Sequence, residues 1–386
     1  MFARLGDGQK PDRARKGSEM QNTNTGIRMG LYLSILCAGF ALHAQTWSFT
    51  GSMETPRANQ SATLLQNGQV LVAGGRQRGN YNLSTAEIYN PSTGKFTSTG
   101  SLNTGRNYQT ATLLENGQVL ITGGATDASG QVVCLASAEL YNPSTGKFTV
   151  TGSMKTARCS QTATLLNSGM VLIAGGDVNS NVVASAELYN PSTGTFSATG
   201  SLNTARAGHT ATLLENGDVL IAAGGTATGY LASAELYNPS TGAFTYTGSL
   251  NTARGLFTAT RLENGNVLVV GGENSGNIWL ASAEVYNPSS GKFSATGSLN
   301  TSRFYQTANL LLNGDVLIEA GNHGGSIASA ELYNPSSGTF TVTASMNTAR
   351  QNQPSVLLNN GDVLVPGGFD GDGGNCCYQT SAELYH

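Results

Sequence analysis

An arginine and a glutamate recur together seven times along this chain, and their side chains carry its most evident chemistry. The arginines are Arg57, Arg106, Arg158, Arg206, Arg254, Arg303 and Arg350. The glutamates are Glu87, Glu139, Glu187, Glu235, Glu284, Glu331 and Glu383. A guanidinium and a carboxylate form strong charge-assisted hydrogen bonds, and either group could also hold a charged ligand. Because every copy has both members, we predict seven structural ion pairs that are at least partly buried.

A second set of residues lies three positions after each arginine. It consists of Gln60, Gln109, Gln161, His209, Phe257, Gln306 and Gln353. Five amides in one place could bind sugar hydroxyls, but each could also hydrogen-bond the backbone of a neighbouring copy, and we favour this second interpretation. His209 and Phe257 break the pattern, so they are candidates for contact with a ligand that lacks sevenfold symmetry.

Two charged residues occupy positions that are uncharged in the other copies. Arg261 stands where the other six copies have leucine, and Glu319 stands where they have alanine, threonine, valine or proline. A charge in such a slot is costly unless it is paired or faces a water-filled channel. Each is therefore a candidate functional residue, although the two could simply satisfy one another.

The elements that must position these residues are short strands, repeated with a period of roughly fifty residues. Within residues 201–248, the apolar pattern predicts strands at 210–214, 219–223, 233–237 and 244–247, with an Asn-Gly turn after the first and an Asn-Pro turn after the third. No stretch has apolar residues at helical spacing. Seven copies predict an all-β fold, a seven-bladed β-propeller of four-stranded antiparallel blades.

The two ends of the chain predict how the ring closes. The last copy stops at His386, after its third strand. The missing fourth strand is found at residues 46–53, which match residues 195–202 of an inner copy. We therefore predict that the N-terminal strand 46–53 completes blade seven as its outermost strand. An open solenoid with a frayed end is the alternative.

Blade geometry indicates which face of the ring binds a ligand. The Asn-Gly and Asn-Pro turns on one face barely vary, whereas the loops 76–84, 126–136, 177–184, 273–281 and 369–380 on the other face diverge between copies. A fixed scaffold with divergent loops favours this variable face for recognition. The ligand-binding candidates are Tyr108, His209, Phe257, Arg261, Trp279, Tyr305, Glu319 and His323.

The Gly-Gly pairs, Ser-Ala-Glu-x-Tyr runs and Asn-Thr-Ala-Arg segments of residues 46–386 resemble Kelch repeats, in the style of the propellers related to galactose oxidase. That resemblance raises the hypothesis of a copper site. In this family the site uses two tyrosines, two histidines and a cysteine linked to one tyrosine. The residues on offer here are Tyr108, Tyr305, Cys159, His209 and His323. The family's adjacent Tyr-His pair is missing from the variable face, as is the extra domain that supplies a ligand. We expect no metal and no other cofactor.

A periplasmic Kelch propeller is also known to act as a sialic acid mutarotase, a reaction that needs only an acid and a base. Glu273, Glu319 and His323 could fill these roles, but no motif specific for the reaction is present. We expect a binding or interaction module rather than an enzyme. A carbohydrate-active enzyme, either mutarotase-like or oxidase-like, is the alternative.

The N-terminal segment differs from the rest of the chain. Residues 1–28 are polar and basic and are expected to be a disordered or wrongly assigned extension, and residues 29–44 are typical of a signal peptide cleaved after Ala44. Residues 45–386 then form the propeller. A secreted or periplasmic protein with no membrane attachment after cleavage is predicted.

Charge and cysteine content limit the partners. The chain has a formal net charge of −3, and loss of the basic leader makes it more acidic, which argues against nucleic acid. We expect a monomer with a protein or glycan ligand on the variable face. Cys134, Cys159, Cys376 and Cys377 remain after cleavage. A bridge between the first two is possible, and their pairing stays open.

Overall fold

The computed structural model describes residues 45–386 except 80, 129–130, 179–180 and 372–376. The predicted extension 1–28 and signal peptide 29–44 lie outside the described residues. Those described contain strands and turns, and none of them forms a helix long and apolar enough to cross a membrane. The all-β prediction is confirmed.

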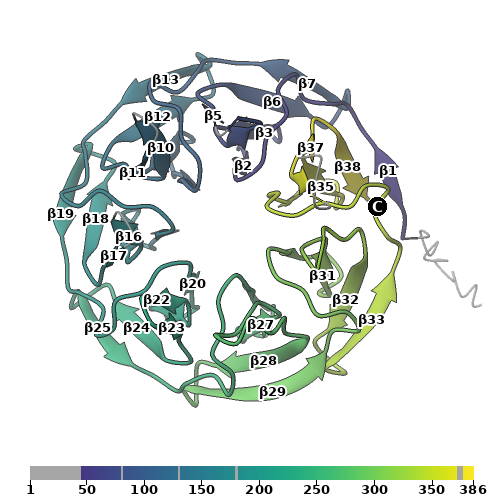
Figure 1. Cartoon of the computed structure of the whole chain (residues 1–386). Coiled ribbons are helices and arrows are strands. Elements are labelled where there is room, and N and C mark those ends of the chain that lie inside the picture. Colours follow the sequence, from purple (N-terminus) through teal and green to yellow (C-terminus); the bar gives the residue numbers. More distant parts are fainter. Residues whose placement is uncertain (1–44, 80, 129–130, 179–180, 372–376) are drawn as a thin grey trace, which may run out of the picture. The chain divides into compact units, whose positions relative to one another are not determined.

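Seven four-stranded antiparallel sheets are arranged in a ring around a central axis (Figure 1). Blade 1 contains β2 (Ser61–Leu64), β3 (Val70–Ala73), β6 (Ala86–Asn90) and β7 (Lys95–Ser98). Blade 2 contains β8 (Thr110–Leu113), β9 (Val119–Thr122), β12 (Ala138–Asn142) and β13 (Lys147–Val150). Blade 3 contains β14 (Thr162–Leu165), β15 (Val171–Ala174), β18 (Ala186–Asn190) and β19 (Thr195–Ala198). Blade 4 contains β20 (Thr210–Leu213), β21 (Val219–Ala222), β24 (Ala234–Asn238) and β25 (Ala243–Tyr246).

The remaining blades follow the same order. Blade 5 contains β26 (Thr258–Arg261), β27 (Val267–Val270), β28 (Ser282–Asn287) and β29 (Lys292–Ser298). Blade 6 contains β30 (Thr307–Leu310), β31 (Val316–Glu319), β32 (Ala330–Asn334) and β33 (Thr339–Thr343). Blade 7 contains β34 (Val356–Leu357), β35 (Val363–Pro366), β38 (Ala382–Tyr385) and β1 (Trp47–Phe49). The seven-bladed prediction is confirmed.

The second strand of every blade is its most buried element, as the continuous apolar runs predicted. In blade 4, β21 is buried at all four positions and pairs with β20 and β24, with Val219 opposite Leu213 and Tyr237. The turn before it places Gly217 at φ 88°, a conformation that favours glycine. This strand has a partner strand at each edge and a neighbouring blade against each face. Because both faces are buried, its sequence is apolar at every position.

The ring closes through the N-terminal strand, as predicted. β1 is the outermost strand of blade 7 and pairs with β38, with Trp47 opposite Tyr385 (Figure 1). Its paired region is Trp47–Phe49, which is shorter than the predicted 46–53. The Trp47 indole Nε1 donates to the Ala344 carbonyl at 2.8 Å, so this strand also contacts blade 6.

Hydrophobic clusters and hydrogen bonds join neighbouring blades. One cluster combines Leu71 and Ala73 of blade 1 with Val119 and Ile121 of blade 2. In addition, the tyrosine hydroxyl of each third strand bonds a threonine near the end of the preceding blade's outer strand. These pairs are Thr50–Tyr89, Thr99–Tyr141, Thr151–Tyr189, Thr199–Tyr237, Thr247–Tyr286, Thr296–Tyr333 and Thr343–Tyr385, at 2.8–3.1 Å. The core therefore lies between blades rather than within them.

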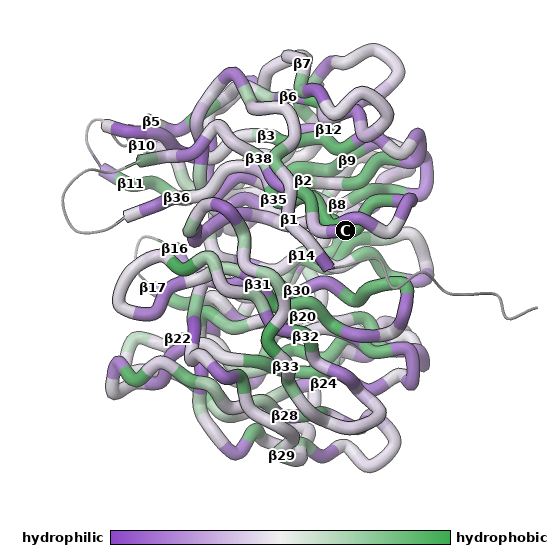
Figure 2. Tube along the Cα trace, turned by 90° about the vertical axis from the view of Figure 1, so that its right-hand side faces the viewer, coloured by the Kyte–Doolittle hydropathy of each residue, from purple (hydrophilic) through white to green (hydrophobic). Residues whose placement is uncertain are grey.

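The two faces of the ring differ as the sequence indicated. Five blades extend their second-to-third loop into a small hairpin. These hairpins are β4–β5 (Arg76–Gln77 and Tyr81–Asn82), β10–β11 (Ala125–Ala128 and Gln131–Cys134), β16–β17 (Asp177–Val178 and Asn181–Val182), β22–β23 (Gly225–Thr226 and Gly229–Tyr230) and β36–β37 (Phe369–Asp370 and Cys377–Tyr378). In the side view they lie together at one end of the ring (Figure 2). The short turns occupy the other end.

Replacing Trp47 tests the closure. Trp47 is 9% exposed and belongs to the cluster between blades 6 and 7, whereas Phe49 on the same strand is 59% exposed. We expect Trp47→Ala to lower the free energy of unfolding by about 3 kcal/mol or more, as large-to-small core substitutions do. Phe49→Ala should change it by less than about 0.5 kcal/mol. Denaturant unfolding of both variants measures this, and equal effects would contradict a closing role for β1.

Candidate binding site at the mouth of the channel

The arginine of each copy is fully buried and fixes the chain where it enters a blade. In blade 4, Arg206 Nη2 lies 2.9 Å from Glu235 Oε1, and Nη1 donates to the carbonyl oxygens of Ala223 and Ser233 at 2.8 Å. The Glu235 carboxylate also accepts from the backbone N–H groups of Asn203 and Thr204. Burial lowers the pKa of Arg206 and Glu235 opposes that fall. The guanidinium of Arg206 stays charged. The groups that it binds belong to the scaffold of its own blade.

The same pair is present in all seven blades. In each pair the closest nitrogen–oxygen distance is 2.6–3.0 Å. The pairs are Arg57–Glu87, Arg106–Glu139, Arg158–Glu187, Arg206–Glu235, Arg254–Glu284, Arg303–Glu331 and Arg350–Glu383. Each arginine's carbonyl oxygen in turn accepts from a glycine N–H of the preceding blade. An example is Gly224 to Arg254 at 3.1 Å, and Gly368 to Arg57 at 2.9 Å joins blade 7 to blade 1. None of these side chains is left for a ligand.

The residue two positions after each arginine forms a ring at the mouth of the channel. These residues are Asn59, Tyr108, Ser160, Gly208, Leu256, Tyr305 and Asn352, and their φ angles are 49–57°. Left-handed backbone is uncommon outside glycine, and seven copies of it show that the flanking bonds impose it. Backbone bonds link members of the ring, including Asn59 N–H to Asn352 at 2.9 Å and Tyr305 N–H to Leu256 at 3.1 Å.

This ring and the one after it line a single axial pocket of about 530 Å³. Its walls are the seven left-handed residues, the seven residues that follow them, and Pro354. Tyr108 is 41% exposed and Tyr305 is partly buried, whereas His209 and Phe257 are buried. The structure therefore brings together four of the sequence-predicted candidates. Of the other members, five are glutamines that repeat around the ring, whereas the remaining left-handed residues differ between most blades.

The glutamines of the pocket use their donors on the scaffold. Nε2 of Gln60, Gln109, Gln161 and Gln306 donates to a backbone carbonyl of the preceding blade at 2.9 Å, and Gln353 Nε2 lies 3.4 Å from Thr307 Oγ1. A carbonyl can only accept, so it fixes which end of the amide faces it. The five Oε1 atoms are buried and have no hydrogen-bond partner in the structure. The five glutamine side chains of the pocket wall thus carry buried acceptor oxygens that the protein itself does not satisfy.

His209 and Phe257 depart from this pattern in different ways. His209 Nε2 lies 3.0 Å from Thr162 Oγ1, and Nδ1 has no partner. Burial, reinforced by the charge of Arg206, lowers the pKa of His209 to about 3, so its imidazole is neutral. Phe257 shares a hydrophobic cluster with Ala223, which replaces the first glycine of the usual Gly-Gly pair. The aromatic ring occupies the place of an amide.

Aromatic and acidic side chains extend the pocket at its rim. Burial and the nearby Tyr108, Tyr230 and Glu273 raise the pKa of Tyr305 to about 12. The Tyr230 hydroxyl is hydrogen-bonded to Glu273, which with burial raises the pKa of Tyr230. Groups from blades 4, 5 and 6 therefore lie close together at the mouth, and Tyr108 approaches Tyr305 from blade 2.

Trp279 and His323 lie on the same side. The Trp279 ring centroid is 6.2 Å from Phe304 and 5.2 Å from His323, and Phe304 lies 5.1 Å from Tyr305. His323 is exposed and its Nδ1 lies 3.0 Å from Ser302 Oγ. Both predicted residues thus belong to an aromatic ledge beside the pocket rather than to its lining.

Glu319 lies between blades 6 and 7 and is fully buried. Its Oε1 accepts from Thr307 Oγ1 at 2.9 Å and Asn309 Nδ2 at 3.0 Å, whereas Oε2 has no hydrogen-bond partner. Burial raises the pKa of Glu319 to about 7, an effect that the neighbouring Ser355, Thr307, Arg303 and Asn309 only partly offset. The carboxyl sits behind the pocket wall and does not line it.

The structure corrects two expectations for Arg261. It is the last residue of β26, opposite Val267, so it lies next to the Asn-Gly turn, at the end of the channel away from the variable face. It is exposed there, within a ring of leucines from the other blades. Among the described residues no ion pair joins it to Glu319, whose strand end lies at the opposite end of the channel. Strand direction separates the two charges.

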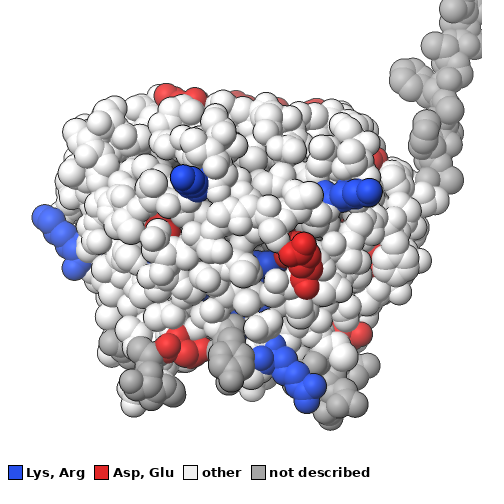
Figure 3. Space-filling model, turned by 90° about the horizontal axis from the view of Figure 1, so that it is seen from above, with Lys and Arg blue, Asp and Glu red and all other residues white. Residues whose placement is uncertain are grey.

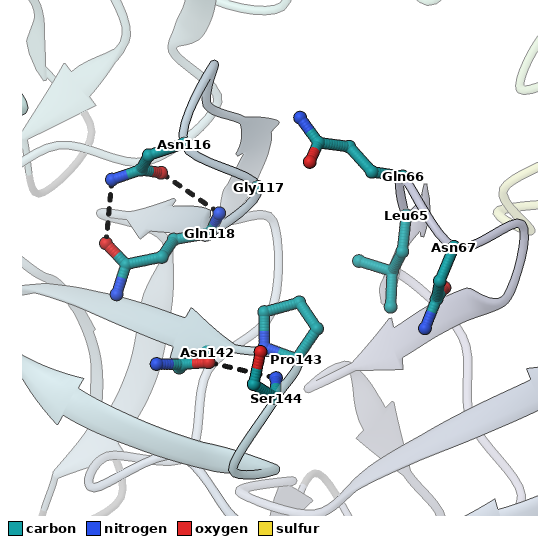
Figure 4. A pocket seen from close by; sticks show the side chains of 9 residues that line it. All are labelled: Leu65, Gln66, Asn67, Asn116, Gly117, Gln118, Asn142, Pro143 and Ser144. Carbon is teal, nitrogen blue, oxygen red and sulfur yellow. Dashed lines mark hydrogen bonds between the residues drawn. The ribbon is translucent and has the colours of Figure 1, made fainter.

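Grooves also occur on the face formed by the turns, between neighbouring blades. One of about 390 Å³ is lined by residues of the Asn-Gly turns of blades 1 and 2 and by Asn142, Pro143 and Ser144 (Figure 4). Its polar groups bond one another, as in Asn116 with Gln118 at 3.0 Å and Ser144 N–H with Asn142 at 2.9 Å (Figure 4). Equivalent grooves recur elsewhere around the ring. They follow from the repeat, so the axial pocket is the better candidate site.

Comparison with known proteins agrees with this architecture. Residues 57–103, which include blade 1, match the Kelch motif. A fungal alcohol oxidase of the AA5 family, solved in complex with copper, has a similar fold, with a TM-score of 0.70 and 15% sequence identity over 89% of this chain and 76% of that one. No curated protein matches the sequence. The chain is a seven-bladed β-propeller with a Kelch motif.

Titration of two pocket-region groups gives a pH test. Between pH 4.5 and about 7 the folded chain holds a proton on Glu319 that the unfolded chain has lost, so the free energy of unfolding falls as pH rises. Between about pH 3 and 6.5 the unfolded chain holds a proton on His209 that the folded chain excludes, so stability rises with pH. The two effects oppose each other from pH 4.5 to 6.5.

Single substitutions should expose each contribution. We expect His209→Gln, which restores the usual amide, to leave stability falling by about 3 kcal/mol between pH 4.5 and 7. Glu319→Gln should instead leave stability rising from about pH 3 to 6.5. Urea unfolding from pH 3.5 to 8 measures both profiles. If both variants followed the pH profile of the parent, that result would contradict the shifted pKa values of His209 and Glu319.

Proposed function

We propose that the protein is a secreted binding module that takes a neutral, hydroxyl-rich ligand, a carbohydrate, at the axial pocket. The observation that carries the proposal is the ring of five buried glutamine oxygens without partners. Secretion is supported by the signal-peptide pattern of residues 29–44.

A ligand that reaches the glutamine oxygens has to offer them hydrogen-bond donors. Because four glutamine Nε2 groups are held by backbone carbonyls, the amides cannot turn to offer their donors without breaking those bonds. A buried acceptor left without a partner costs free energy, and a donor from the ligand removes that cost. Sugar hydroxyls are suitable donors, and several of them can meet several oxygens at once.

The aromatic side chains suit the apolar faces of a sugar ring. Tyr108 and Tyr305 stand at the mouth on nearly opposite blades, and Phe257 lies deeper. Apolar walls with a few well-placed polar groups are typical of small-molecule sites. A flat ring bound between such side chains would cover them from water while its hydroxyls reach the glutamines.

Charge favours a neutral ligand over an anionic one. No lysine or arginine lines the pocket, and its one titratable nitrogen base, His209, is neutral. Arg76 lies near Tyr108 at the rim. On the side wall seen in Figure 3, basic and acidic side chains are few and stand apart, without a patch of one sign that would suit a nucleic acid.

Copper chemistry is the less well supported alternative, because the described residues do not gather the ligands it needs. His209 is buried against Thr162, whereas His323 is exposed on blade 6 and bonded to Ser302. Cys159 is bridged to Cys134 and is not linked to a tyrosine. Within the described part of the chain, the one group of three metal-binding side chains lies elsewhere.

Mutarotation is the second candidate, and one observation favours it. Tyr230 and Glu273 form a hydrogen-bonded acid–base pair at the rim, beside Tyr305. A carboxylate and a phenol placed beside a bound sugar could move protons on and off its anomeric oxygens. Of the other predicted acid–base residues, Glu319 is fully buried, and His323 lies beside Trp279 on the ledge.

The proposal is tested on protein secreted with its own leader. The intact mass should show that the mature chain begins at Gln45. On a glycan array of neutral, amino and sialylated sugars, the protein should bind neutral sugars. We expect Tyr108→Ala to weaken the best hit about tenfold or more. Tyr246→Ala, which removes a 59% exposed tyrosine from an outer strand, is the matched control and should bind as the parent does.

Three outcomes would count against the proposal: retention of the leader, binding of sialylated sugars alone, or equal loss in both variants. Exchange of anomers in the NMR spectrum of a bound reducing sugar, abolished by Glu273→Gln, would replace the binding role with mutarotation.

A further inference from the structure

A disulfide joins blades 2 and 3 beside the variable face. Cys134, the last residue of β11, is bonded to Cys159, which follows the buried Arg158, and both are at least nine-tenths buried. The sequence left this pairing open. Cys377 is exposed and free, and Cys376 lies outside the described residues.

A carboxylate faces both sulfur atoms. Asp177 Oδ1 lies 3.5 Å from Cys134 Sγ and 3.3 Å from Cys159 Sγ. All three donor atoms lie within 4.8 Å of one another, and in the part of the chain that the structure describes no other three such side chains come together. A disulfide that only joins two blades does not need a carboxylate beside its sulfur atoms.

The backbone holds these residues in place without the S–S bond. Cys159 and Asp177 exchange N–H···O bonds of 3.1 and 2.8 Å. Cys134 pairs with Ala125 in the β10–β11 hairpin, and the next residue, Leu135, is bridged to Arg158. The three Cα positions are therefore fixed by main-chain bonds on two neighbouring blades, so they should remain close when the cysteines are reduced.

Donor chemistry indicates which ion would fit. Thiolates select soft or borderline metals, whereas calcium and magnesium take oxygen ligands. Zinc accepts sulfur at about 2.3 Å and carboxylate oxygen at about 2.0–2.2 Å, usually with four ligands in a tetrahedron. Three protein ligands leave a fourth position for water.

We propose that Cys134, Cys159 and Asp177 form a zinc site when the disulfide is reduced. A thiol reductant supplies two electrons and two protons, which break the S–S bond and give two thiols while the reductant is oxidised to its own disulfide. Zn²⁺ then displaces the two thiol protons and binds both thiolates and the carboxylate. In the oxidising compartment that secretion implies, the two cysteines carry the disulfide, and the zinc site forms only after a reductant has opened it. This site is independent of the carbohydrate proposal.

Metal titration of the mature protein, residues 45–386, tests the site. Oxidised protein and protein reduced without oxygen are titrated with Co²⁺, and Zn²⁺ is then used to displace it. We expect the reduced protein to bind one equivalent, with sulfur-to-cobalt charge-transfer absorption and the visible bands of tetrahedral cobalt. The oxidised protein should show neither.

Variants separate this site from other thiols. Asp177→Asn keeps both cysteines and should weaken zinc binding about tenfold or more. Cys159→Ser should abolish the charge-transfer band. Cys376→Ser/Cys377→Ser is the matched control and should bind as the parent does. No uptake by the reduced parent, equal uptake by the oxidised parent, or loss in the control alone would overturn the proposal, even if Cys159→Ser failed to fold.

Discussion

The rest of this structure depends on one interaction, the buried ion pair between the arginine and the glutamate of each blade. In blade 4 the guanidinium of Arg206 binds the Glu235 carboxylate and two backbone carbonyls, and the carboxylate binds two backbone N–H groups. A buried charge is tolerable only with such complete pairing. The pair thereby fixes the point where the chain leaves one blade and enters the next.

The pair also determines what the mouth of the channel displays. Each arginine carbonyl is bound to the preceding blade, and the residue two positions later has left-handed backbone and lines the axial pocket. Seven different side chains can occupy this ring while the bonds beneath them stay the same. The scaffold is repeated, and the recognition surface is not.

Small departures from the repeat change the pocket locally. Ala320 replaces the first glycine of the pair in blade 6, with φ 60°, and the adjacent Gln353 lies 3.4 Å from Thr307 instead of bonding a backbone carbonyl. Near it, the buried Glu319 accepts a hydrogen bond from the partly buried Asn309, and Glu319 stands at a position that is uncharged in the other blades. Ala320, Glu319 and Asn309 together make this sector of the ring unlike the others.

The sequence predicted the fold well because turns and apolar runs determine it. Asn-Gly and Asn-Pro turns set strand length, and the match of residues 46–53 to an inner copy predicted the closure. The candidate site was harder to predict from the sequence. The variation among residues such as Asn59, Ser160 and Leu256 was visible in the sequence, but their left-handed backbone arises from bonds between blades and gives no local signal. Arg261 was misplaced because its end of the channel depends on strand direction.

The free energy of unfolding of Glu235→Ala tests the central claim most directly. The substitution leaves Arg206 buried, charged and without its carboxylate, and it frees two backbone N–H groups. The account predicts a loss of about 3–5 kcal/mol. A change within about 0.5 kcal/mol, the range of an ordinary surface substitution, would contradict it.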